Sequence, residues 1–211
     1  MVQRIDNDAG LRRDIDRACK VDTELAKILA KVGYPAPRVY RPGYDTMLQI
    51  MVSQQLSTKA AAAIWSRLVE RCLGDVSGET ILELGESCLR ECGLSMQKIR
   101  YAKALAIMLK EQRIDIEPDP GTDCEEVIKL LCNISGVGRW TAEIYAMFAL
   151  GYTDIYPAND LALQVAVQRY LKLDKRLNES ETRAVAIRWK PYRSAVSLLM
   201  WRYYGSTTMD A

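Results

Sequence analysis

Residues 131–142 have the sequence LCNISGVGRWTA, in which one helical apolar pattern ends, two glycines follow and a second helical pattern begins. Gly136 and Gly138 permit a positive φ and the close approach of this backbone to another molecule. A helix that begins at Gly138 or Arg139 presents free N–H groups and the positive end of its dipole, which suits a phosphate oxygen. A G-x-G by itself fits an ordinary tight turn, and it is the longer string that favours a phosphate-binding hairpin.

The composition excludes several classes of protein. The chain has 211 residues, of which 49% are hydrophobic and 27% charged. Its apolar runs are far shorter than the roughly 18 residues that cross a bilayer. Residues 1–16 mix Arg and Asp without an apolar core, so we expect no secretory signal and place the protein in the cytoplasm. The chain contains no histidine, which excludes Ser–His triads and His-ligated zinc sites.

Cysteines and charges are less specific. The six cysteines include no C-x-x-C pair, and we interpret them as reduced and mostly buried thiols. The net charge is +2, but residues 93–113 and 183–202 contain five basic residues each, whereas 111–129 contain seven acidic ones. Each basic segment fits a solvated helix face, with phosphate binding as the alternative.

Apolar residues recur at three- and four-residue spacing along most of the chain without an alternating strand pattern, so we predict an all-α fold. The predicted helices cover 25–32, 47–56, 60–73, 99–109, 142–150, 161–171 and 195–203. The candidate N-caps are Asp45, Ser57, Thr122 and Asn159. A break at Pro118–Gly121 is the predicted boundary between two lobes.

Three further motifs accompany the hairpin. They are SQQLS at 53–57, PANDL at 157–161, and WKPYRS at 189–194 followed by Trp201. Together the four motifs resemble the helix–hairpin–helix DNA glycosylases of base excision repair, and among these the 3-methyladenine DNA glycosylase II branch. The resemblance extends over nearly the whole chain.

The resemblance implies a two-lobe helical glycosylase core with an active-site cleft between the lobes. Lobe A would cover about residues 43–117, and lobe B would cover 1–42 and 118–211. Some relatives have an N-terminal β-domain, for which the residues before position 20 leave no room. We therefore expect the minimal form of the fold.

The resemblance assigns the catalytic role to Asp160. Its carboxylate would stabilise the positive charge that develops on the sugar as the N-glycosidic bond breaks. An alkylated purine already carries a positive charge and leaves without a proton, so one carboxylate suffices and the missing histidine is no obstacle. The alternative is that Asn159 and Asp160 only cap the helix that follows.

The resemblance also implies an aromatic base pocket. Relatives that cleave the DNA strand have a lysine where this chain has Trp140, so we predict a monofunctional enzyme in which the indole face binds a cationic base. Trp201 corresponds to a second pocket tryptophan, and Ile144 stands where relatives often have an aromatic residue. The candidates to replace that aromatic residue are Tyr44, Tyr145 and Tyr156. Core packing is the competing interpretation of both tryptophans.

Other residues are implied to contact the DNA. Gln55, with Gln54 beside it, corresponds to the loop that fills the space left by an extruded base, and the alternative is that both glutamines bridge helices internally. The phosphate contacts fall on the backbone N–H groups of Gly136, Gly138 and Thr141. Further phosphate candidates are the side chains of Arg139, Lys98, Arg100 and Lys103.

Hairpins of this family hold a monovalent cation, Na+ or K+, and the resemblance places it on the backbone carbonyls of Cys132, Ile134 and Val137. No cysteine follows position 132, so the iron–sulfur cluster of another branch is not expected. We expect no cofactor for catalysis.

We therefore predict a monomeric, monofunctional DNA glycosylase of base excision repair, associated with the nucleoid and acting on double-stranded DNA. Its expected substrates are alkylated purines, above all 3-methyladenine and then 7-methylguanine. One alternative is the excision of neutral lesions such as ethenoadenine or hypoxanthine. The other is a hairpin protein that binds damaged DNA without catalysis.

Overall fold

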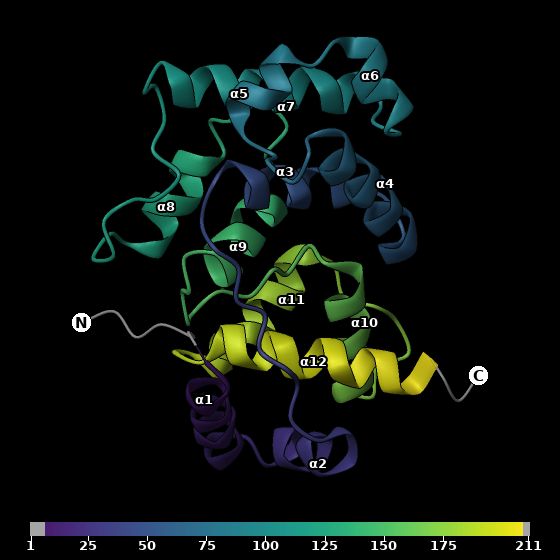
Figure 1. Cartoon of the computed structure of the whole chain (residues 1–211). Helices are drawn as coiled ribbons and strands as arrows, with labels where there is room; N and C mark the ends of the chain where they lie inside the picture. Colours follow the sequence, from purple (N-terminus) through teal and green to yellow (C-terminus); the bar gives the residue numbers. More distant parts are fainter. Residues whose placement is uncertain (1–6, 209–211) are drawn as a thin grey trace. The chain divides into compact units, whose positions relative to one another are not determined.

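The computed structural model describes residues 7–208, with side chains described through Ser206, and its regular structure in that range is helical without a strand (Figure 1). The helices are α1 (Asp8–Val21), α2 (Thr23–Val32), α3 (Tyr44–Ser53), α4 (Thr58–Arg71), α5 (Gly78–Glu83), α6 (Glu86–Glu91), α7 (Met96–Lys110), α8 (Cys124–Leu131), α9 (Arg139–Phe148), α10 (Leu161–Tyr170), α11 (Glu179–Ala186), the 3-10 helix η1 (Ile187–Trp189) and α12 (Arg193–Thr208). The predicted all-α class is confirmed. Within the described range, none of these helices has the length and apolar character needed to cross a membrane.

The chain divides into two compact units. Of the described residues, unit 1 contains 7–39 and 146–208, and unit 2 contains 40–145. Residues 118–145 therefore group with 40–117, whereas the predicted lobe B places them with the C-terminal residues. The reason is that the hairpin between α8 and α9 lies on α3 and α7, where Gln54 donates a hydrogen bond to it and the Tyr101 ring lies against it.

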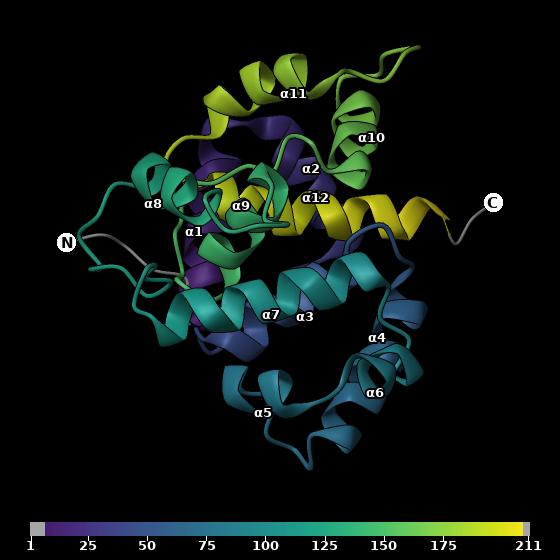
Figure 2. The same cartoon turned by 90° about the horizontal axis from the view of Figure 1, so that it is seen from above.

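The core of unit 2 forms where α3, α4 and α7 meet, and α7 lies along α3 (Figure 2). α7 buries four residues at three- and four-residue spacing, which places them on one face: Ile99, Ala102, Leu105 and Ala106. Each buried Ile or Leu side chain contributes about 1.5–3 kcal/mol relative to an exposed one. All six cysteines are free thiols, as predicted, but only Cys72 and Cys92 are fully buried.

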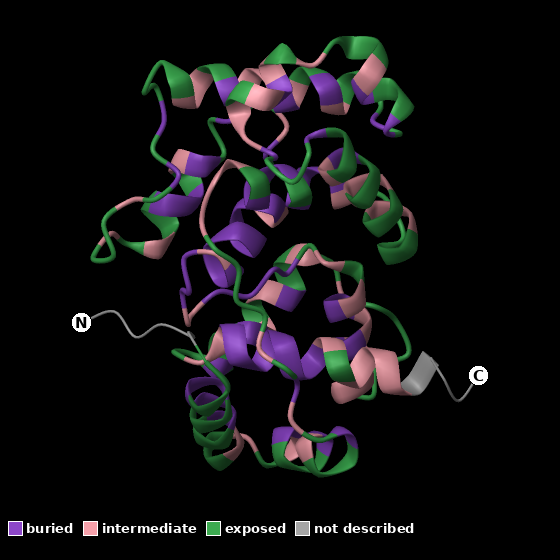
Figure 3. Ribbon diagram, in the orientation of Figure 1, coloured by how far each residue is buried: buried purple, intermediate pink, exposed green. Residues whose placement is uncertain are grey.

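Unit 1 is built around α12, which contacts α1, α2 and α10. Every residue from Ser194 to Met200 is buried, so this part of the helix is enclosed on all sides (Figure 3). The buried hydroxyls find backbone partners: Ser194 Oγ donates to Tyr152 O (2.7 Å), and Ser197 Oγ donates to Arg193 O (2.9 Å). α12 is therefore a rigid support for the helix α10 that packs on it.

Of three predicted N-caps in the middle of the chain, one is confirmed and two are wrong by one position. Ser57 caps α4, as predicted. Asp123 caps α8 in place of Thr122, and Asp160 caps α10 in place of Asn159. In each pair the aspartate side chain accepts a backbone N–H of the first turn, which an asparagine or threonine one position earlier cannot reach.

Helix α3 differs from the prediction at both ends. It begins at Tyr44 with Gly43 as its N-cap, so Asp45 lies within the first turn instead of capping the helix. It ends at Ser53 instead of continuing to residue 56. Gln54, the C-cap, has ψ 131°, which takes the chain out of the helical region, and Gln55 follows in the loop with φ +57°.

Candidate functional site

The hairpin joins α8 to α9 through residues 132–138, and its two glycines have different surroundings. Gly136 has φ +86°, and a Cβ on it would lie 2.2 Å from Cδ2 of Tyr101, so no larger residue fits there. Gly138 has no neighbouring heavy atom within 4 Å of where a Cβ would be. The first glycine therefore lets the hairpin lie against α7, and the second leaves open space for another molecule.

The N-terminus of α9 has the geometry expected of a phosphate contact. Its first backbone hydrogen bond runs from Ala142 N–H to Gly138 O (3.0 Å). The backbone N–H groups of the residues before Ala142 lie in the first turn, where the helix has no carbonyl that could accept their hydrogen bonds. Thr141 is 2% exposed and its Oγ1 accepts a hydrogen bond from Gln54, so the role predicted for Thr141 depends on its backbone N–H.

The three carbonyls predicted to hold a cation belong to the same turn. Ile134 and Val137 bury their side chains, whereas Cys132 is exposed. Ile134 O also accepts a hydrogen bond from Val137 N–H (3.0 Å), which closes the turn. Among the described residues, no three Cys, Asp or Glu side chains are grouped as metal ligands, and the cation on the carbonyls stays a prediction.

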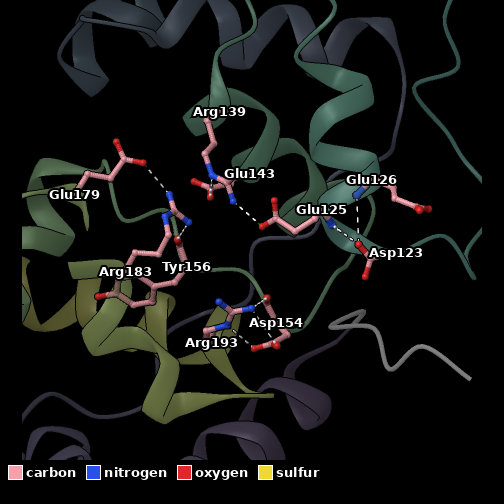
Figure 4. A network of polar contacts seen from close by, with 10 residues as sticks. All are labelled: Asp123, Glu125, Glu126, Arg139, Glu143, Asp154, Tyr156, Glu179, Arg183 and Arg193. Atoms are coloured by element: carbon pink, nitrogen blue, oxygen red, sulfur yellow. Dashed lines mark hydrogen bonds and ion pairs between the residues drawn. The ribbon is translucent and has the colours of Figure 1, made fainter. Parts of the chain in front are cut away.

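Arg139 is held by two carboxylates of unit 2 (Figure 4). Its Nε donates to Oε1 of Glu143 (3.0 Å), and its Nη2 donates to Oε1 of Glu125 (2.6 Å). The hydrogen bond to Glu125 is the main cause of the raised pKa of Arg139. Glu143 is 1% exposed, so the guanidinium compensates a buried negative charge. The structure therefore gives no support to a phosphate contact by Arg139.

Several basic residues of the segment 183–202 in unit 1 are likewise held by internal partners (Figure 4). Arg183 pairs with Glu179 (2.9 Å), and Arg193 pairs with Asp154 (2.6 Å). Arg202 donates to a backbone carbonyl in the N-terminal part of the same unit. Arg193 and Arg202 thus tie α12 to other segments of unit 1, whereas Arg183 pairs with Glu179 within α11.

The plug loop, residues 54–56, contains two glutamines in different environments. Gln54 Nε2 donates to Gly136 O (2.9 Å) and to Thr141 Oγ1 (2.8 Å), so Gln54 forms the internal bridge that was the alternative to a plug. Gln55 is exposed and has φ +57°, a left-handed conformation that is unfavourable for residues other than glycine. Of the two predicted plug residues, only Gln55 remains a candidate.

Lys98, a predicted phosphate candidate, binds the end of α3 instead. Its Nζ donates to Val52 O (2.6 Å) and to Gln54 O (2.9 Å). Burial lowers the pKa of Lys98. An ammonium group at this position interacts favourably with the C-terminal carbonyls and the dipole of α3.

A hollow of about 730 Å³ lies in unit 2 between the hairpin, the plug loop and the start of α7. Its walls are formed by residues 132–138 of the hairpin, by the plug loop, and by Ser95, Gln97, Lys98 and Tyr101. Amides, hydroxyls and backbone groups make up much of this lining, and they can bind a polar, hydrated ligand. The predicted plug residue Gln55 and two of the residues predicted to bind phosphate, Gly136 and Gly138, therefore line one hollow.

Asp160, in unit 1, is partly exposed and caps α10. Its Oδ1 accepts hydrogen bonds from Leu163 N–H (3.1 Å) and from the indole Nε1–H of Trp201 (3.1 Å). One donor comes from α10 and the other from α12, so the carboxylate is fixed from two sides. The capping role is present, and it leaves catalysis open because the carboxylate is not sealed in the core.

Trp201 has other neighbours besides Asp160. Its ring centroid lies 5.9 Å from that of Phe148, and the guanidinium carbon of Arg38 lies 5.5 Å above the indole. The indole therefore orients the carboxylate while it packs against Phe148 and Arg38 within unit 1. No sequence motif surrounds Arg38, which lies in the Pro- and Gly-containing segment 33–42, so it could not be predicted.

The other predicted pocket residues are largely core residues. Trp140 is partly buried in the first turn of α9. Ile144 is 7% exposed, and Tyr44 donates its hydroxyl to Ala102 O (2.9 Å), with burial raising the pKa of Tyr44. The two alternatives to Tyr44 are buried as well: Tyr145 and Tyr156. The pocket role is thus unsupported for Tyr44 and Ile144, whose side chains tie helices together.

A family model described as an HhH-GPD superfamily base excision DNA repair protein matches residues 48–191, which contain the plug loop, the hairpin and Asp160. The chain belongs to the HhH-GPD superfamily. This HhH-GPD chain is 26% identical over 201 residues to the alkylbase DNA glycosidase-like protein mag2 of Schizosaccharomyces pombe, covering 92% of this chain and 94% of that protein. It is 31% identical over 166 residues to YfjP of Bacillus subtilis, of which it spans 58%.

A solved HhH-GPD structure is also similar. The 3-methyladenine DNA glycosylase Mag1 of Schizosaccharomyces pombe, in complex with abasic DNA, superposes with a TM-score of 0.82 at 26% identity, covering 90% of this chain and 95% of that one. The fold predicted from the hairpin and its companion motifs is confirmed by this likeness and by the family match.

Proposed function

We propose that this HhH-GPD chain is a monofunctional DNA glycosylase that hydrolyses the N-glycosidic bond of alkylated purines in base excision repair. The observation that carries the proposal is Asp160, a partly exposed carboxylate fixed by Leu163 N–H and the Trp201 indole, in the segment matched by the family model. The names of the relatives support the substrate class, since mag2 is named for alkylated bases and Mag1 for 3-methyladenine.

The chemistry requires one carboxylate. As the bond between base and sugar breaks, positive charge develops on the sugar, and the Asp160 carboxylate stabilises that charge while orienting the attacking water. The two hydrogen bonds to Oδ1 hold the group in place before the reaction, so it does not have to reorient as the charge forms. A base alkylated at N3 or N7 is cationic and leaves as a neutral purine, without a proton from the protein.

Binding of the DNA is assigned to unit 2. The backbone amides of Gly136, Gly138 and Thr141 would bind one phosphate, with a monovalent cation on the carbonyls of the same turn. Gln55 would enter the space of the extruded nucleotide, because it is exposed and its amide can both donate to and accept from the unpaired base.

The lack of strand cleavage follows from Trp140. A lyase needs an amine that forms a Schiff base with the sugar, and the chain has an indole at that position. The indole face would favour a cationic base over a neutral one by about 0.5–2 kcal/mol. We therefore place 3-methyladenine first among the substrates and 7-methylguanine second. The proposal also includes a monomeric state and a location at the nucleoid.

The test is incubation with duplexes that each contain one modified base, followed by alkali to reveal abasic sites. The proposal predicts cleavage after alkali, and none before it, with 3-methyladenine and 7-methylguanine. Preferred release of ethenoadenine or hypoxanthine would contradict the substrate class. Specific binding of abasic DNA without release of any base would contradict the enzyme function, and light scattering checks the monomeric state.

A further inference from the structure

The plug loop begins at a helix end that α7 holds in place. Lys98, on α7, donates from Nζ to Val52 O (2.6 Å) and to Gln54 O (2.9 Å). Two of the last carbonyls at the C-terminus of α3 thus share one ammonium group. The backbone immediately before Gln55 is therefore held by the Lys98 side chain, which is 44 residues away from Gln54 in the sequence.

The side chain of Gln54 fixes the same point to the hairpin. Its single Nε2 carries two N–H groups, and the two acceptors are Gly136 O (2.9 Å) and Thr141 Oγ1 (2.8 Å). Gly136 and Thr141 are two of the three residues whose backbone amides are assigned to the phosphate. The bridge therefore joins the start of the plug loop directly to the phosphate-binding turn.

α7 supports both partners of this bridge. Tyr101, three residues after Lys98 and hence on the same side of α7, lies against Gly136 at a distance that admits only glycine. Lys98 holds the loop and Tyr101 supports the hairpin, while Gln54 connects the two. All four residues line the hollow described above, with Gln55 at its edge.

We infer that Gln54 and Lys98 are positioning residues that set the distance between the bound phosphate and the plug residue Gln55. The inference rests on the proposed function. Because Gln55 follows directly after the fixed backbone and keeps a left-handed φ of +57°, its place relative to the hairpin depends on these hydrogen bonds. Binding of the phosphate and insertion of Gln55 then occur as one event, and Gln54 acts through Gln55 without entering the duplex itself.

The experiment uses duplexes with a non-hydrolysable abasic analogue and 2-aminopurine in the opposite strand, whose fluorescence changes when the plug enters. Gln54→Ala should slow the fluorescence change by about tenfold, the loss expected for two neutral hydrogen bonds. Lys98→Met should also slow the fluorescence change, and Lys98→Arg should be faster than Lys98→Met but slower than the wild type. Gln49→Ala changes an exposed glutamine of α3; it is the matched control and should match the wild type.

Combining Gln54→Ala with Gln55→Ala distinguishes a positioning role of Gln54 from a general loss of folded structure. If Gln54 acts through Gln55, the double variant should insert no more slowly than Gln55→Ala alone. Effects that multiply, or a wild-type rate in Gln54→Ala, would overturn the inference. Thermal unfolding of each variant is measured in parallel, and if Gln54→Ala does not fold, the Lys98→Met and Lys98→Arg pair decides by the same criterion.

The two proposals fail in different ways. Because the abasic analogue is not hydrolysed, insertion is measured without any excision. A wild-type protein that does not distinguish the abasic duplex from intact DNA would overturn the proposed function and the inference with it. Normal discrimination with independent Gln54 and Gln55 effects would overturn the inference alone.

Discussion

Replacing Gly136 with alanine is expected to destabilise unit 2. The new Cβ would lie 2.2, 2.5 and 2.7 Å from three atoms of the Tyr101 ring, much closer than non-bonded carbons approach. Alanine would also have to keep φ near +86°. The left-handed backbone costs about 1–2 kcal/mol and overpacking about 1–3 kcal/mol. The free energy of unfolding should therefore fall by about 2–5 kcal/mol, the sum of those two costs.

Urea-induced unfolding followed by far-UV circular dichroism measures this change. Gly138→Ala is the matched control, since nothing lies within 4 Å of its Cβ position; because Gly138 precedes the first turn of α9, where alanine is a poor N-cap, the free energy of unfolding should fall by no more than about 1 kcal/mol. Combining Gly136→Ala with Tyr101→Ala removes the clash, so the double variant should be more stable than the sum of the two single effects. A Gly136→Ala protein within about 0.5 kcal/mol of the wild type would contradict the predicted clash with Tyr101.

Two further predictions concern unit 1. Burial alone would raise the pKa of Asp22, but hydrogen bonds from Tyr170, Trp189 and two backbone amides outweigh it and lower that pKa below its ordinary value. Asp22→Ala should therefore reduce the free energy of unfolding by about 1–3 kcal/mol at pH 7, and the difference should shrink as the pH falls through the folded-state pKa; an equal difference at pH 7 and pH 3 would contradict this. Trp201→Phe keeps a ring but loses the donor to Asp160, so the single-turnover excision rate should fall about tenfold to a hundredfold with duplex affinity little changed; an unaltered rate would show that the indole does not position the carboxylate.

The helical class and the hairpin could be predicted because both depend on local patterns. Apolar spacing marks α3, α4, α7 and α12, and the two glycines mark the turn before α9. The predicted ranges do not include α1, α5, α6 or α11; for α5 and α6, six residues are too few to show a helical period. The grouping of residues 118–145 with unit 2 depends on contacts of Gln54 and Tyr101 with the hairpin, which no local pattern encodes.

Site residues could be predicted where they stand in a sequence motif. Their roles could not be predicted where these depend on a hydrogen-bond partner far away in the sequence. Asp160 stands in a motif, but its hydrogen bond from Trp201 joins residues 41 positions apart. Lys98 carries a positive charge on a basic helix. Only the folded chain shows that its ammonium group donates to backbone carbonyls 44 and 46 residues away. Arg139 is an intermediate case: Glu143 follows it at i+4, a spacing that could have indicated the ion pair.

The most direct test of the account is the single-turnover release of 3-methyladenine by Asp160→Asn. Asparagine is a good N-cap and keeps Oδ1 as an acceptor for Leu163 N–H and the Trp201 indole, so the fold should be preserved and only the charge lost. We expect the rate to fall by at least about a hundredfold, while the affinity for a duplex with an abasic analogue stays close to that of the wild type. Release at the wild-type rate would contradict the catalytic role of Asp160.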